Sequence, residues 1–163
     1  MLYLSIMNSL DTFLNQPQHA SLVEEYHVLE GAEDKLTWLM ERTPMHVAVP
    51  VSECTPERRV PGCLSGLWLS AQMRDNNYFF ACASESEVVQ GIGSLLCDLY
   101  SQRSASEILR IGSAFATELR LDGLLTLTRR RAVSSIVGFI LHSASGRDSG
   151  RDSDVLSAPD RAA

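Results

Sequence analysis

The sequence has little positive charge, no long apolar run and no closely paired cysteines. It contains 14 Lys and Arg residues against 20 Asp and Glu residues, for a formal net charge of −6. Because phosphate binding needs a concentrated basic surface, this balance argues against a nucleic-acid partner. The one dense basic cluster, Arg129-Arg130-Arg131, is too short to change that conclusion.

Signals for membrane insertion and secretion are missing as well. No apolar run approaches the roughly 20 residues that are needed to span a bilayer. The apolar N-terminus has no basic residue before it and no small-residue cleavage site after it, which predicts no signal peptide. We therefore expect a cytoplasmic protein without a membrane partner.

The four cysteines do not form a recognisable ligand or redox motif. Cys54, Cys63, Cys82 and Cys97 are irregularly spaced and include no C-x-x-C pair. This spacing gives no support for a zinc knuckle or a thioredoxin motif, and cytoplasmic thiols stay reduced. Each cysteine therefore has to be judged by its own surroundings.

The patterns of apolar residues along the chain predict an α+β domain. From Leu67 the apolar residues alternate, "RDNN" (74–77) is a turn signal, and "YFFACA" (78–83) is a second strand, so we expect an antiparallel hairpin. Apolar residues at helical spacing predict helices in 9–42, interrupted at Pro17 and weakened at Gly31, and again after residue 84. "MHVAVPV" (45–51) is expected to add a short edge strand. The helices should pack on this small sheet.

Capping signals predict where the later helices begin. Ser84 with Glu87, and Ser104 with Glu107, have the spacing of a capping box, and Thr128 is expected to cap the final helix. The chain then divides into an N-terminal helical segment (1–32), a main domain (33–142) and a tail (143–163). Because the tail is rich in Ser, Gly, Arg and Asp and has almost nothing to bury, we expect it to be disordered.

Cys63 is the residue most open to a functional reading. It follows Pro61-Gly62 and precedes the first strand, so it should lie on a loop where Gly62 lets the backbone turn. Ser65 and nearby backbone N–H groups could stabilise a thiolate or persulfide anion. A free cysteine is equally often a small buried hydrophobe, and the local residues leave both readings open.

The stretch "RVPGCLSGLW" (59–68) resembles the signature of SufE-type proteins, which accept sulfur from cysteine desulfurases in iron–sulfur cluster assembly. The pattern Val-x-Gly-Cys-x-Ser-x-(Val/Leu)-Trp is filled at each fixed place, by Val60, Gly62, Cys63, Ser65, Leu67 and Trp68. "DKLTWLMER" (34–42), "SESEVVQGIGSLLCDLY" (84–100) and "LTLTRRRAV" (125–133) resemble further segments of the family. Several motifs in the same order are more specific than one short pattern.

The resemblance implies a SufE/NifU-like fold and a sulfur acceptor that stimulates a desulfurase rather than acting alone. A SufS-type cysteine desulfurase would pass persulfide sulfur to Cys63, and iron–sulfur scaffold proteins would receive it. It implies no resident cofactor or metal, only a transient cysteine persulfide. A persulfide must be sheltered from other thiols, so we expect the Cys63 thiol to be shielded, with Leu64 and Leu67 as its cover.

Gly62, Ser65, Trp68 and Arg129 are the expected supporting residues. Trp68 should pack beneath the loop, and Arg129 takes the arginine place of the family segment, in a first helical turn that the helix dipole disfavours for a cation. That misfit favours an ion pair or a partner contact for Arg129. The chain departs from the family where Gln90 replaces a basic residue, Leu127 replaces proline and Ala132-Val133 replaces Gly-Leu.

The other cysteines and one histidine leave an alternative open. Cys54 is a loop cysteine that could act as a resolving thiol, Cys82 is expected in the core, and the helical wheel allows Cys97 an exposed place. An iron- or zinc-binding scaffold could use Cys63 with Cys82 or Cys97, with His46 as a further ligand. Without ligand spacing, His46 is more simply a surface or edge residue.

Overall fold

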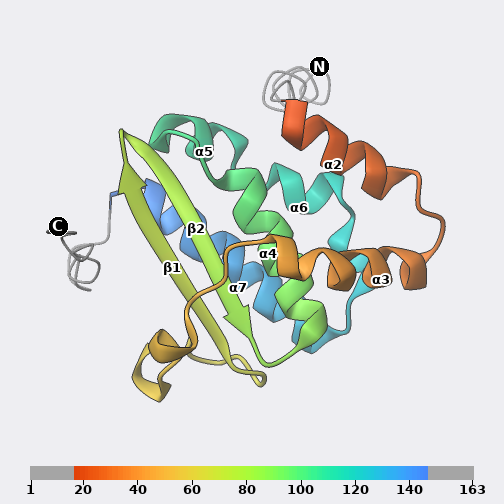
Figure 1. Ribbon diagram of the computed structural model, residues 1–163, viewed down its shortest axis with the longest axis horizontal. Coiled ribbons are helices and arrows are strands. Elements are labelled where there is room, and N and C mark those ends of the chain that lie inside the picture. The colour runs from red at the N-terminus through yellow and green to blue at the C-terminus, as the bar shows by residue number, and fades with distance from the viewer. Residues whose placement is uncertain (1–16, 147–163) are drawn as a thin grey trace, which may run out of the picture.

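Two neighbouring strands form one antiparallel hairpin, as the alternating pattern predicts (Figure 1). β1 runs over Leu67–Arg74 and β2 over Asn77–Ser84, and the two strands pair from end to end. The turn residues Asp75 and Asn76 have φ angles of 49° and 64°. Two left-handed residues in a two-residue turn match the twist of the strands, which is why this Asp-Asn pair suits the hairpin.

Helices make up most of the remaining chain in this computed structural model, which describes residues 17–146. They are α2 (Pro17–His27), α3 (Ala32–Arg42), α4 (Glu87–Tyr100), α5 (Ala105–Ile111), α6 (Ala114–Glu118) and α7 (Leu127–Ala144). Short 3-10 turns lie at Thr43–Met45, Val51–Glu53, Pro56–Arg58 and Leu121–Leu124. The predicted α+β class is confirmed. The helix expected ahead of Pro17, and residues 147–163 of the predicted tail (143–163), lie outside the described residues. The first two residues of that tail, Ser143 and Ala144, are instead the buried last residues of α7.

α4 is the central element of the molecule. It packs on β2 and against α3 and α7, while α7 also contacts β1, so both helices cover one face of the hairpin (Figure 1). Leu95, Leu96 and Leu99 of α4 are buried in the core. Because neighbours surround α4, its more polar side is buried too, as expected for a helix inside a domain.

α2 is bonded into the same core as the later helices. The Tyr26 hydroxyl donates to the Leu119 carbonyl at 2.8 Å, and burial raises the pKa of Tyr26 to about 12. Nη2 of buried Arg103 lies 2.9 Å from Nδ1 of buried His19. Burial and the neighbouring Arg103 lower the pKa of His19, so the imidazole is the neutral acceptor of this bond.

Two predicted helix caps are wrong by two residues each. Ser86, not Ser84, caps α4, and its Oγ accepts from the amide of Val89 at 3.4 Å. Ser84 is used differently because β2 extends as far as this residue. α7 begins after Thr126 rather than Thr128. Leu127 therefore occupies the first helical position, where proline is favoured, so its replacement of the family proline keeps the helix start.

Other helix boundaries follow local chemistry. The predicted capping box of Ser104 and Glu107 is complete, and bonds from the Ser104 amide lower the pKa of the Glu107 carboxyl. α2 begins at Pro17, the residue at which the first predicted helix was expected to end. Gly31 has a φ of 85° and separates α2 from α3, so it ends the helical run rather than only weakening it.

The expected edge strand at 45–51 is reduced to one parallel bridge, between Ala48 and Cys82. The amide of Val49 donates to the Cys82 carbonyl at 3.3 Å. 3-10 turns at Thr43–Met45 and Val51–Glu53 flank this bridge, so no longer strand forms beside β2. The 43–66 segment therefore crosses the end of the sheet as turns, and it ends in the loop that carries Cys63.

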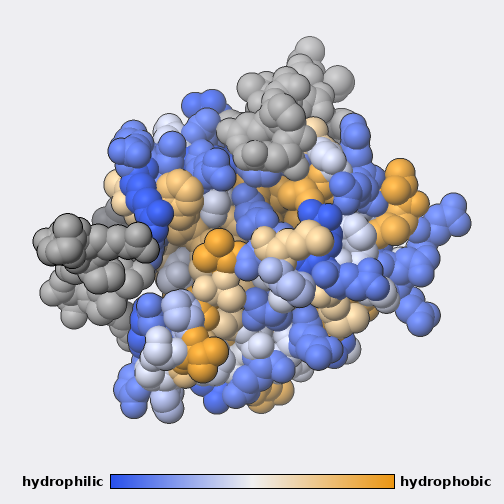
Figure 2. All heavy atoms as spheres, viewed as in Figure 1, coloured by the Kyte–Doolittle hydropathy of each residue, from blue (hydrophilic) through white to orange (hydrophobic). Residues whose placement is uncertain are grey.

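The visible face of the molecule mixes polar and apolar side chains (Figure 2). In Figure 2, hydrophilic side chains interrupt the apolar areas on the face that is shown. Across the helices of residues 17–146, none combines the length and the apolar character that crossing a bilayer requires.

Candidate functional site

Cys63 lies in a loop whose two ends are held together by main-chain bonds. The amide of Val60 donates to the Leu67 carbonyl at 2.8 Å and closes the loop. The Gly66 amide donates to the Glu85 carboxylate at 2.8 Å, and the Glu85 amide donates to the Gly66 carbonyl at 3.0 Å. The short segment that contains Cys63 is thus fixed at both ends.

Gly62 and Arg59 shape the segment around Cys63. Gly62 has a φ of 79°, a left-handed conformation that glycine adopts without the strain of a side chain. Nη2 of Arg59 donates to the carbonyls of Cys63 and Leu64, at 3.3 Å and 3.0 Å. Sequence reasoning did not single out Arg59, because its part comes from reaching across the loop and not from a motif.

α7 provides the opposite wall of a small pocket at Cys63. The pocket is lined by Cys63, Leu64, Ser65, Val89, Thr128, Arg129 and Ala132. Its volume of about 10 Å³ is room for about one atom of the size of a water oxygen. The fold therefore brings Cys63, Ser65 and Arg129 together, although Arg129 is far from the loop in the sequence.

The Cys63 side chain is half-buried, and its neighbours differ from those expected. Leu64 is 80% exposed, and Leu67 is buried in the core. The thiol instead lies toward α7, where it donates to Oγ of Ser135 at 3.9 Å. Side chains of α7 thus lie beside the thiol, and the flanking leucines, one exposed and one in the core, do not form the expected cover.

The Trp68 side chain lies against the end of the Cys63 loop, at Gly66. Its Nε1 donates to the Thr55 carbonyl at 2.7 Å. A Cβ atom on Gly66 would lie 2.5 Å from the Trp68 ring and 2.7 Å from the Glu85 carboxyl carbon. Gly66 is thus required by close packing, which the family pattern, with a variable residue at this place, does not reveal.

We expect Gly66→Ala to loosen the Cys63 loop. The added methyl must displace the Trp68 ring and the Glu85 carboxylate, and overpacking of this kind costs about 1–3 kcal/mol. The variant should unfold at lower urea concentration and alkylate faster at Cys63 than the parent. Gly123→Ala is the control, because nothing lies within 4 Å of a Cβ there. Equal alkylation rates in Gly66→Ala and the parent would contradict this role.

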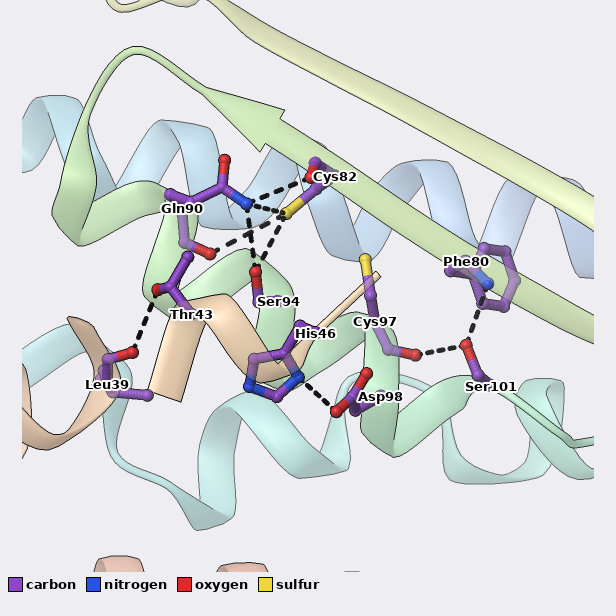
Figure 3. Close-up of polar contacts among 10 residues, drawn as sticks. All are labelled: Leu39, Thr43, His46, Phe80, Cys82, Gln90, Ser94, Cys97, Asp98 and Ser101. Atoms are coloured by element: carbon purple, nitrogen blue, oxygen red, sulfur yellow. Dashed lines mark hydrogen bonds and ion pairs between the residues drawn. The ribbon is translucent and has the colours of Figure 1, made fainter. Parts of the chain in front are cut away.

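Cys82 and Cys97 lie between β2 and α4, within a network of polar side chains (Figure 3). Nε2 of Gln90 donates to the Cys82 carbonyl and to Ser94 Oγ, both at 3.1 Å, and Gln90 Oε1 accepts from the Ser84 amide at 2.6 Å. Gln90 thus joins the end of β2 to α4. Its polar atoms are used inside the fold, and it does not line the Cys63 pocket.

The two buried thiols are free, and each affects the pKa of the other. A hydrogen bond with Cys97 lowers the pKa of Cys82, and the same bond, together with burial, raises the pKa of Cys97. Cys82 lies in the core as predicted, but the exposed place that the helical wheel allows for Cys97 is wrong, because β2 covers that side of α4. Neither thiol is open to a partner protein.

Cys54 is separate from the Cys63 pocket. Its thiol donates to the Pro50 carbonyl at 3.4 Å. Burial, with the nearby Glu53 carboxylate, raises the pKa of Cys54. A thiol held protonated is a poor nucleophile at neutral pH, which favours the reading of Cys54 as an incidental loop cysteine.

The ligand set of the scaffold hypothesis is not assembled in the part of the chain that the structure describes. There, no three His, Cys, Asp or Glu side chains come together in a way that could hold a metal ion. Nδ1 of His46 instead contacts the Asp98 carboxylate of α4 (Figure 3), and the His46 side chain is only 4% exposed. The imidazole is thus buried against α4, although His46 belongs to the segment that pairs with the edge of the sheet at Ala48.

The chain matches a known family and several curated proteins. The family model for SufE, the Fe-S metabolism associated domain, matches residues 20–144. A chloroplastic quinolinate synthase of Arabidopsis thaliana is 31% identical over 111 residues, which cover 68% of this chain and 15% of that protein. An uncharacterized SufE-like protein of Mycobacterium tuberculosis is 29% identical over 130 residues, which cover 74% of this chain and 87% of that protein.

A third match, SufE-like protein 1 of Arabidopsis thaliana (chloroplastic/mitochondrial), is 32% identical over 84 residues, covering 51% of this chain and 23% of that protein. The chain spans 15% and 14% of the length of two chloroplastic quinolinate synthases that it matches, from Arabidopsis thaliana and Nicotiana tabacum. It spans most of the Mycobacterium tuberculosis protein.

Proposed function

This chain belongs to the SufE family, whose domain is associated with Fe-S metabolism, and we propose that it accepts sulfur from a cysteine desulfurase on Cys63. The observation that carries the proposal is the position of Cys63, on an anchored loop beside a pocket with room for about one atom. A persulfide adds one sulfur atom to the thiol. The pocket leaves space beside the residue that would carry that atom.

The transfer is a relative of thiol–disulfide exchange. The Cys63 thiolate attacks the outer sulfur of a persulfide on the desulfurase. A new S–S bond forms at Cys63 while the donor's S–S bond breaks, and the donor cysteine leaves as a thiolate. The sulfur atom changes carrier without a net change in oxidation state, so the step needs no further oxidant or reductant.

The residues around Cys63 support this chemistry. Arg129 lines the pocket, and in this proposal its positive charge favours the thiolate or persulfide anion. Arg59 and Gly62 hold the loop conformation, and the apolar Val89 limits water at the sulfur. In this proposal the desulfurase carries the cofactor chemistry, and this chain supplies one nucleophile and its shelter.

The proposal assigns the chain no resident cofactor. Its partners are a cysteine desulfurase of the SufS type, which donates sulfur, and an iron–sulfur scaffold protein, which receives it. The chain stimulates the desulfurase by removing its product. A reducing compartment such as the cytoplasm suits this role, because Cys63 has to return to the thiol form after each transfer.

The direct test is to mix the protein with a desulfurase and free cysteine, and to map added mass by peptide mass spectrometry. We expect one sulfur atom on the peptide that contains Cys63, removed by a reducing thiol. Sulfur found on another cysteine, or none at all, would refute the proposal.

Shielding of the thiol gives a second prediction. Cys63 should be alkylated slowly in the free protein, because its side chain is half-buried against α7, and faster once a docked desulfurase opens the loop. The measurement compares iodoacetamide labelling of the free protein, of the mixture and of the urea-unfolded chain. If the free protein labels as fast as the unfolded chain, the thiol is not shielded.

A further inference from the structure

Ser135 lies beside the reactive sulfur but belongs to none of the motifs. On α7, Ala132 comes four residues after Thr128, and Ser135 comes three residues after Ala132. This spacing places all three on one face of the helix. Thr128 and Ala132 line the Cys63 pocket, and Ser135 continues this face to the Cys63 thiol.

The hydroxyl of Ser135 makes two hydrogen bonds of opposite sense. Its oxygen accepts from the Cys63 thiol at 3.9 Å, a long bond whose acceptor is a neutral group. Its proton is donated to the Arg131 carbonyl, one helical turn earlier, at 3.0 Å. A serine hydroxyl has one proton and two acceptor sites. Here the proton bonds the helix carbonyl, and one acceptor site of the oxygen receives the thiol proton.

Loss of the thiol proton changes the sulfur from a hydrogen-bond donor to an acceptor. A thiolate has no proton to donate and attracts a donor. The Ser135 hydroxyl can supply one by rotating about its Cβ–Oγ bond. The rotation gives up only a side-chain bond to a helix carbonyl, an interaction that stabilises a helix little. The bond gained has a charged acceptor and is the stronger of the two.

We propose that Ser135 is a positioning residue that holds the Cys63 sulfur in both states, accepting from the thiol at rest and donating to the anion formed for transfer. The inference rests on the proposed function of Cys63. It adds a residue of α7 that tunes the nucleophile without forming a bond to the transferred sulfur.

Three charged groups hold the Cys63 loop or line its pocket, and they have to stay constant in a test. Arg59 reaches the loop from its start, Arg129 lines the pocket from α7, and Glu85 binds the Gly66 amide from the end of the hairpin. Variants at residue 135 leave all three in place, so a change in the titration of Cys63 reports the hydroxyl.

The experiment measures iodoacetamide alkylation of Cys63 against pH in a Cys54→Ser background, where the other described cysteines are buried. Ser135→Ala should reduce the thiolate fraction about tenfold, as expected for a lost bond to a charged acceptor, and move the profile about one pH unit higher. A less acidic thiolate is more nucleophilic, so the rate at neutral pH should fall only about threefold.

Two matched variants decide between this role and a change in the helix. Ser135→Thr keeps the hydroxyl and should restore the profile. Ser134→Ala makes the same change at the exposed neighbour and should leave it unmoved. The proposal is overturned if Ser135→Ala keeps the parent profile, if threonine fails to restore it, or if Ser134→Ala shifts it equally. Failure of the proposed function would appear in the sulfur mass assay instead, because alkylation requires no desulfurase.

Discussion

Cys63→Ser is expected to abolish sulfur acceptance while leaving the fold nearly unchanged. Serine is close to cysteine in size, and residue 63 lies in a loop outside the regular elements. A few per cent of an ordinary thiol is ionised near neutral pH, whereas a hydroxyl stays protonated and is a far weaker nucleophile. With desulfurase and free cysteine, the variant should gain no sulfur mass, and its urea unfolding curve should overlay that of the parent.

The remaining cysteines are the matched controls for this result. Cys54→Ser, Cys82→Ala and Cys97→Ala should each still gain one sulfur atom on Cys63. Cys82→Ala and Cys97→Ala will also lose some stability, because both thiols are buried between β2 and α4. Sulfur uptake by Cys63→Ser, or an equal loss of uptake in any control, would point to a relay through several thiols.

Gly91→Ala should be the most damaging of the glycine substitutions for stability. A Cβ on Gly91 would lie 2.9 Å from the carbonyl carbon and oxygen of Leu39, so it would push the backbones of α3 and α4 apart. Alanine is a better helix former than glycine by about 1 kcal/mol, but overpacking against a backbone costs about 1–3 kcal/mol or more. We expect a net loss of about 2 kcal/mol in the free energy of unfolding.

Gly138→Ala is the control with the opposite expected sign. Gly138 also lies within a helix, α7, but nothing stands within 4 Å of a Cβ there. The gain in helix propensity should therefore act alone and raise the unfolding free energy by about 0.5–1 kcal/mol. Urea titrations followed by circular dichroism measure both variants. Gly91→Ala as stable as the parent would show that α3 yields to the added methyl at little cost.

The strongest local patterns predicted their elements correctly. The alternation from Leu67, interrupted by "RDNN", led to the hairpin because a two-residue turn and a period of two are both local properties. The capping box of Ser104 and Glu107 was equally readable, since cap and partner lie within one turn. At Ser84 the same spacing gave a wrong helix start, because Ser84 pairs with Leu67 as the last residue of β2. Strand pairing joins residues that are distant in the sequence, so a local pattern does not record it.

The polar side of α4 is buried, although its sequence pattern allows it to face solvent. Gln90, Ser94 and Cys97 share a helical face that the wheel allows toward solvent. In the fold, β2 covers this face, and the three side chains form a bonded network with Cys82. A helical wheel records only spacing along one element. It cannot record that a second element lies on the side that looks polar.

The sequence by itself determined the α+β class, the hairpin and the loop that carries Cys63, because propensity, turn chemistry and a contiguous motif act over a few residues. The tertiary structure alone decided what lies around the thiol. Arg129 and Ser135 reach Cys63 only because α7 packs against the loop and the hairpin, more than 60 residues along the chain. Contacts at that separation depend on how whole elements pack, and no local pattern contains that information.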